Sequence, residues 1–132
     1  IMRQETKVFL EFIARRRMEK ISGSSPELQA ELVMDDSGLR CALQVTRNGE
    51  LVRLEFIESE ATAGKQTHFP DYIEVARSVG SLAIFFPESR FSRDLASSIY
   101  QSVLKEARQG IDRDIAFLGF VYDGKGNLKK VD

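Results

Sequence analysis

Apolar and polar residues alternate along residues 28–58 in three short runs, and a turn separates each run from the next. The turns, Asp36-Ser37-Gly38 and Asn48-Gly49, use residue types that tolerate the positive φ angles of tight connections. The pattern predicts a three-stranded antiparallel meander with one dry face and one wet face. Its dry-face positions are Leu28, Ala30, Leu32, Met34, Leu39, Cys41, Leu43, Val45, Val52, Leu54 and Phe56.

The intervening positions of the meander define its predicted wet face. Mixed charge at cross-strand positions is typical of a solvated sheet surface. We therefore expect this face to be exposed and open to a partner. It carries Gln29, Glu31, Gln44, Thr46, Arg53 and Glu55, interspersed with the apolar Val33, Ala42 and Ile57.

The segment before the meander, residues 2–20, contains strong helix formers and neither Gly nor Pro, so we expect a helix. Gly23, which has a serine on each side, is expected to end it. The apolar residues of this helix cover more than one ordinary stripe. Such a helix is expected to lie between two layers or to contact a second subunit. The residues concerned are Val8, Phe9, Leu10, Phe12, Ile13 and Ala14.

Residues 70–122 alternate helix and strand signals. Pro70-Asp71 opens one expected helix and Ser92 caps another, while 81–87 and 114–122 are expected strands that are apolar on both faces. A short edge strand is expected to end the chain. The sequence thus predicts one domain over 1–132, of the α+β class (or α/β with a mixed sheet), with the apolar strands in mid-sheet.

Composition narrows the classes of function. The net charge of −1 provides no global field that would attract nucleic acid or anionic lipid. No apolar run approaches the roughly 18 residues of a membrane helix, and no secretion signal is recognisable. These features predict a cytoplasmic protein without a membrane partner.

Histidine and cysteine offer little catalytic chemistry, because each occurs once, as His68 and Cys41. One histidine cannot build a multi-histidine zinc site, and no Gly-x-Ser-x-Gly turn presents a serine to it. Cys41 falls on the dry face of the meander, where a small core residue is expected. The sequence predicts no catalytic or metal site at these two residues.

Carboxylates provide the enzymatic alternative. Asp36 follows the first strand, Glu74 lies in the helix after the meander, and Glu88 follows the next strand. This order of elements is similar to that of ribonuclease-H-like folds, in which acidic residues at such places bind Mg²⁺ or Mn²⁺. A second nuclease architecture, with a helix before three strands, needs a lysine that residues 55–57 do not supply. Asp36, Glu74 and Glu88 are therefore the expected ligands if the chain is a metal-dependent nucleic-acid hydrolase.

Basic residues gather toward the end of the first helix, at Arg15, Arg16, Arg17 and Lys20. Three adjacent arginines cannot all face one way on a helix. We expect this segment to contact a partner, and a further alternative is non-catalytic binding of nucleic acid.

The leading prediction is a non-catalytic interaction or regulatory module without a cofactor. It would bind a protein partner or a second copy through the first helix, the exposed sheet face, or both.

Overall fold

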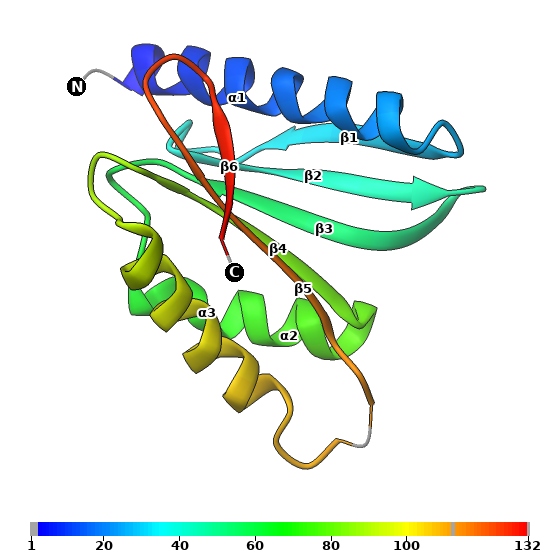
Figure 1. Cartoon of the computed structure of the whole chain (residues 1–132). Helices are drawn as coiled ribbons and strands as arrows, with labels where there is room; N and C mark the ends of the chain where they lie inside the picture. Colours follow the sequence, from blue (N-terminus) through cyan, green and yellow to red (C-terminus); the bar gives the residue numbers. More distant parts are fainter. Residues whose placement is uncertain (1–2, 112, 132) are drawn as a thin grey trace.

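The computed structural model describes residues 3–111 and 113–131, which form a six-stranded mixed sheet with helices on both faces (Figure 1). Strands β3, β4 and β5 are parallel to one another, and the other neighbouring strands are antiparallel. The predicted α+β class and the mid-sheet position of the two apolar strands, β4 and β5, are confirmed. In their order across the sheet the strands are β1 (Leu28–Met34), β2 (Arg40–Arg47), β3 (Glu50–Glu58), β4 (Ser81–Pro87), β5 (Ala116–Tyr122) and β6 (Leu128–Val131).

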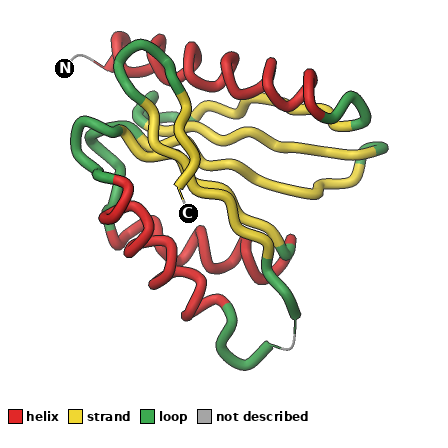
Figure 2. The backbone as a smooth tube through the Cα atoms, viewed as in Figure 1, coloured by secondary structure: helices red, strands yellow, loops and turns green. Residues whose placement is uncertain are grey.

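The helices divide between the two faces of the sheet. Helix α1 (Arg3–Ser24) lies over β1 and β2 on one face (Figure 1). Helices α2 (Phe69–Val79) and α3 (Arg93–Ala107) lie together on the other face, against β3, β4 and β5 (Figure 2). A short turn, η1 (Gln66–His68), leads into α2. None of the helices in the described ranges is long and apolar enough to cross a membrane.

Helix α1 differs from the predicted helix 2–20 at its end. Met2 lies outside the described residues, and the helix continues past Gly23 to Ser24. The added turn is anchored because Ile21 is buried against the sheet. Its carbonyl accepts a hydrogen bond from the Ser25 N–H at 2.8 Å. Burial of one apolar side chain thus outweighs the weak helix propensity of glycine and serine.

Helix α1 carries more apolar surface than the sheet beneath it covers. Leu10, Ile13 and Ala14 are buried in the core between α1 and the sheet. Val8 and Phe12 remain 55% and 41% exposed. No second layer of the described chain covers these two side chains. The expected packing of this helix between two layers is therefore not observed.

The predicted face of the third strand is wrong beyond Val52. In the β2–β3 pairing Val45 lies opposite Arg53, but the next residue of β2 lies opposite Leu51, which leaves Val52 as an extra residue. One extra residue sends every later side chain to the opposite face. Consequently the side chains of Arg53, Glu55 and Ile57 lie on the α1 face, while Leu54 and Phe56 pack on the face of α2.

Gly119 in β5 lets the ring of Tyr100 from α3 lie directly on the sheet. A Cβ at this position would come within 2.1 Å of the ring. The ring is held there, because its hydroxyl donates to Ile84 O and accepts from the Phe120 N–H.

We expect Gly119→Ala to lower the free energy of unfolding by about 3 kcal/mol, the upper end of typical overpacking costs. Urea unfolding measures this change, and Gly124→Ala, whose Cβ meets nothing within 4 Å, is the control, expected within about 0.5 kcal/mol of the wild type.

Candidate functional site

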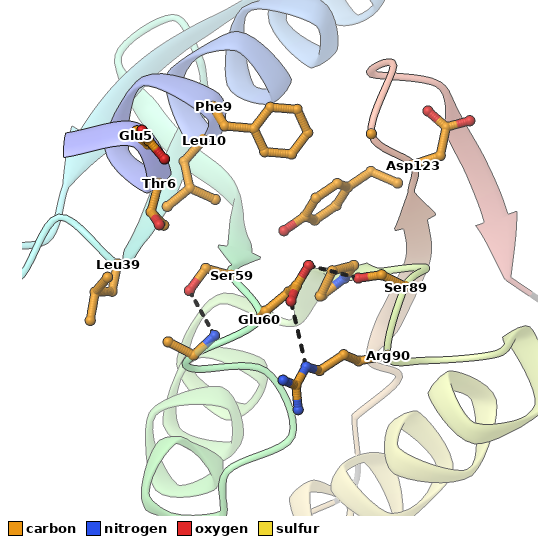
Figure 3. Close-up of a pocket in the computed structure, with 14 residues that line it drawn as sticks. Glu5, Thr6, Phe9, Leu10, Leu39, Ser59, Glu60, Ser89, Arg90 and Asp123 are labelled. Atoms are coloured by element: carbon orange, nitrogen blue, oxygen red, sulfur yellow. Dashed lines mark hydrogen bonds and ion pairs between the residues drawn. The ribbon is translucent and has the colours of Figure 1, made fainter. Parts of the chain in front are cut away.

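A pocket of about 520 Å³ lies where the parallel strands β3, β4 and β5 end, and the N-terminal half of α1 forms its opposite wall (Figure 3). Because the strands are parallel, the segments that follow them meet at one edge of the sheet. The carboxyl ends of parallel strands are where open α/β sheets form ligand clefts. The volume is within the range of about 300–1,000 Å³ that is usual for ligand sites.

Apolar side chains from α1 and the sheet form much of the pocket lining. The ring of Phe9 packs on that of Tyr122, with centroids 5.9 Å apart. The Tyr122 hydroxyl donates to the Glu58 carbonyl at 2.6 Å, and burial raises the pKa of Tyr122 above its ordinary value of 10.0. The remaining apolar lining residues are Leu10, Leu39, Ala61 and Pro87.

Polar groups at the pocket rim are held by one another. Glu60 accepts a hydrogen bond from Ser89 at 2.9 Å and forms an ion pair with Arg90 at 3.5 Å (Figure 3). The carboxylate of Asp123 accepts hydrogen bonds from the side chain and the N–H of Asn127. These bonds, led by the one from the Asn127 side chain, lower the pKa of Asp123 to about 2, so it is ionised at neutral pH.

The charged lining of the pocket is mainly acidic. It includes Glu5, Glu60 and Asp123, whereas Arg90 is the one basic lining residue in the part of the chain that the structure describes. Arg90 is paired with Glu60. Glu5 forms no ion pair with any described side chain. A ligand therefore meets an excess of negative charge around an apolar floor.

A second, more open depression continues from the pocket along α1. Its lining includes Val8 and Phe12, and it shares Glu5 and Phe9 with the pocket. Phe12 lies against the turn between β5 and β6, where Gly126 has no side chain: a Cβ there would come within 2.5 Å of the ring. The pocket and the depression adjoin each other at Glu5 and Phe9, and taken together we call them the α1 groove.

The carboxylate of Glu58, at the end of β3, is saturated by its neighbours. One oxygen accepts from Arg40 Nε (2.9 Å) and the Thr62 hydroxyl (2.9 Å), and the other accepts from Arg40 Nη2 (2.6 Å) and the Tyr72 hydroxyl. Burial works to lower the pKa of Arg40, but the hydrogen bonds and charge of Glu58 raise it overall. With four bonds accepted, this carboxylate has no lone pair directed at a ligand.

A second buried carboxylate, Glu55, binds two arginines beneath α1. Arg17 donates to both of its oxygens (2.7 and 3.0 Å), and Arg53 donates to one of them (2.6 Å). The guanidinium of Arg17 also lies 4.7 Å from the centroid of the Phe120 ring. Cation–π contacts of this kind add to the pairing when the charge is desolvated. This cluster, which was not expected from the sequence, joins α1 to the middle of the sheet.

The four residues of the predicted basic segment do not share one face. Arg15, Arg16 and Lys20 are exposed on α1. Arg17 instead points to the sheet and is bound by Glu55. The predicted partner-binding set is therefore split, and three of its four cations remain accessible.

The structure does not bring Asp36, Glu74 and Glu88 together. Asp36 lies in the turn between β1 and β2, Glu74 is exposed on α2, and Glu88 is paired with Lys129 of β6 at 3.0 Å. Within residues 3–111 and 113–131 no group of three or more His, Cys, Asp or Glu side chains could hold a metal ion. The expected metal-ligand set of the hydrolase alternative is thus not assembled.

Neither His68 nor Cys41 lines the pocket. His68 is the last residue of η1 and is half-buried. Cys41 is buried in the core beneath α1, as the alternation in the meander predicts. Burial raises the pKa of its thiol to about 12, so the reactive thiolate is not formed at neutral pH.

The pocket was not anticipated from the sequence. Its lining comes from five separate segments of the chain, and none of them carries a recognisable motif. The one available signal was the expected succession of strand, helix and strand in 50–122, because crossovers of this kind place strand ends side by side. The chain matches no protein-family model, no curated protein and no solved structure.

Proposed function

We propose that this chain is a non-catalytic protein-interaction module and that the α1 groove receives a segment of a partner protein. The observation that carries the proposal is that the pocket and the depression along the exposed side of α1 adjoin each other and share Glu5 and Phe9. A surface that extends from a pocket along a helix accommodates a row of side chains better than one compact molecule. Val8 and Phe12, large apolar residues left exposed at its outer end, are of the type that a partner covers.

The chemistry of the groove favours a segment that is both apolar and basic. Aromatic and aliphatic residues form the floor, and such floors accept Leu, Ile or Phe side chains. Glu5 and Asp123 add negative charge that no described arginine or lysine pairs with closely. A Lys or Arg next to the apolar residues of the partner segment would complement this charge.

Two features of the buried ionisable groups support binding rather than catalysis. Glu55 and Glu58 are each engaged by arginine, which favours a structural role for them. The tyrosine at the pocket floor has a raised pKa, whereas a general base at neutral pH needs a pKa near 7. These three buried groups are therefore better suited to fixing the shape of the fold around the pocket than to transferring protons.

Selection from a phage library of short random peptides tests the proposal. We expect the enriched peptides to combine Leu, Ile or Phe with Lys or Arg. A synthetic peptide of the enriched sequence should bind the wild type, and Val8→Ser combined with Phe12→Ser should raise its Kd by about tenfold or more, because buried apolar anchors dominate such interfaces. Fluorescence anisotropy of the labelled peptide measures Kd.

Leu95→Ser is the matched control, because Leu95 is a similarly exposed apolar residue (46%) on α3, in the other helical layer. It should leave Kd unchanged. Enrichment of acidic peptides, or the same Kd for the wild type and the double variant, would contradict the proposal. Thermal melting of each variant establishes that a change in Kd does not come from unfolding.

A further inference from the structure

Strand β1 is an edge strand whose backbone has a free side. The Asp35 N–H donates to Arg40 O at 3.0 Å where the β1–β2 hairpin closes. In an antiparallel ladder alternate residues direct their N–H and C=O groups to the same neighbour. Residues 29, 31 and 33 therefore bond to β2, while Ala30, Leu32 and Met34 direct both backbone groups to the open edge. The backbone groups of Leu28 also point to the open edge, but its N–H already donates to Ser25 O at 3.0 Å.

The two edges of the sheet differ in their protection against pairing. β6 is four residues long and carries Lys129 and Lys130. A short edge strand and lysines on it both protect a sheet against edge-to-edge association. β1 is seven residues long, pairs with β2 without a shift of register and contains no Lys, Arg or Pro. This edge thus has the length and regularity that strand addition needs.

We propose that two copies of this chain pair through β1 as antiparallel strands, with Leu32 on the two-fold axis, so that their sheets become continuous. In this register Leu32 lies opposite Leu32 of the second copy, and Ala30 lies opposite Met34 of the second copy. These three residues are the ones whose N–H and C=O groups point outward. Each of them therefore gains both of its missing backbone hydrogen bonds.

Charge favours this register over the two registers in which the two-fold axis passes through the residue before or after Leu32. An axis at Glu31 would place the two Glu31 carboxylates opposite each other, and an axis at Val33 would place Glu31 opposite Asp35. Like charges at directly opposed positions destabilise a strand pair. With the axis at Leu32, Glu31 lies opposite Val33. On the other face the half-buried Ala30, Leu32 and Met34 of both copies meet and extend the core beneath α1.

Helix α1 is compatible with this pairing. Phe9 and Phe12 lie on the flank of α1 that faces β5 and the β5–β6 turn, so the opposite flank, with Glu11, Arg15 and Met18 spaced at helical intervals, is directed to the β1 edge. A two-fold axis through the paired strands makes the two helices antiparallel.

Mass and backbone amide exchange test the proposal together. Light scattering should give twice the 14.9 kDa of the single chain. The amide protons of Ala30, Leu32 and Met34 should exchange slowly, and dilution should accelerate them specifically. Ala30→Pro removes an N–H that the chain's own sheet does not use, so the variant should keep its fold but have half the wild-type mass. Ala30→Ser, which retains the N–H, is the matched control and should stay dimeric.

A monomeric wild type at the concentration of the exchange experiment would overturn the proposal. So would a folded Ala30→Pro variant with the mass of a dimer, because the interface would then lie elsewhere. If Ala30→Pro does not fold, the wild type decides: fast exchange at Ala30, Leu32 and Met34 in a dimer contradicts pairing through β1. Peptide binding in the α1 groove is measured on different residues, so the two proposals fail independently.

Discussion

Replacing Arg17 with alanine is expected to lower the free energy of unfolding by about 3–5 kcal/mol, the usual cost of leaving one member of a buried ion pair without its partner. Glu55 is fully buried, and Arg17 supplies two of its three hydrogen bonds. After the substitution Arg53 alone compensates the charge of the buried carboxylate. Urea unfolding followed by circular dichroism measures the loss.

The adjacent Arg16 provides a matched control for this experiment. It has the same charge and lies on the same helix, but it is exposed. Arg16→Ala should change the free energy of unfolding by no more than about 0.5 kcal/mol. Equal effects at the two positions would show that Arg17 does not pair with Glu55 in solution. A double-mutant cycle with Glu55→Gln isolates the coupling between the two side chains.

The sequence was sufficient to predict most of the fold, because local patterns there agree with the tertiary structure. Alternation in 28–45 matches the buried faces of β1 and β2, and Asn48-Gly49 has the positive φ angles (51° and 80°) expected at that turn. The predicted cap at Ser92 is present, since its side chain accepts from the Leu95 N–H at 3.1 Å. In these places a short-range signal and the global arrangement coincide.

The face of β3 and the role of Arg17 could not be derived in the same way. The bulge at Val52 has no strong signature of its own, yet it moves Glu55 from the outer face to the core. With Glu55 predicted on the solvent face, the sequence shows no partner for Arg17 and does not distinguish it from Arg15 and Arg16. One clue was available: Arg17 lies on the helical stripe of the buried Leu10, Ile13 and Ile21.

Spatial proximity explains why the binding surface was only partly anticipated. The first helix was expected to contact a partner, and its exposed Val8 and Phe12 agree with the expected width of its apolar surface. The pocket beside it depends on loops that follow three different strands. Their approach is set by strand order and by the direction of each crossover, which depend on contacts distant in sequence.

The protein is expected to unfold cooperatively between about pH 10 and pH 12, because four buried groups ionise only when the chain opens. Burial raises the pKa of Tyr72, Tyr100 and Tyr122 above the ordinary value of 10.0, and it raises that of Cys41 from 9.0 to about 12. Above the ordinary values the unfolded chain has lost these protons and the native state retains them. Stability is therefore fully present below pH 9 and falls as the pH rises.

The magnitude follows from proton linkage. Each group contributes about 1.4 kcal/mol per pH unit while the pH lies between its unfolded and folded pKa, so the four together reach about 5–6 kcal/mol per unit. A small domain has only about 5–15 kcal/mol to lose. Since the sequence contains three tyrosines and no tryptophan, near-ultraviolet absorbance of tyrosinate reports directly on these rings. It should rise in one step together with the loss of far-ultraviolet circular dichroism.

Cys41→Ala separates the contribution of the thiol from that of the tyrosines. This variant should delay the onset of the pH dependence from about pH 9 to about pH 10 and reduce its slope by about 1.4 kcal/mol per pH unit. Gradual formation of tyrosinate near pH 10 with unchanged circular dichroism would contradict burial of the three rings. Such a result would also weaken the proposed α1 groove, because Tyr122 forms part of its floor.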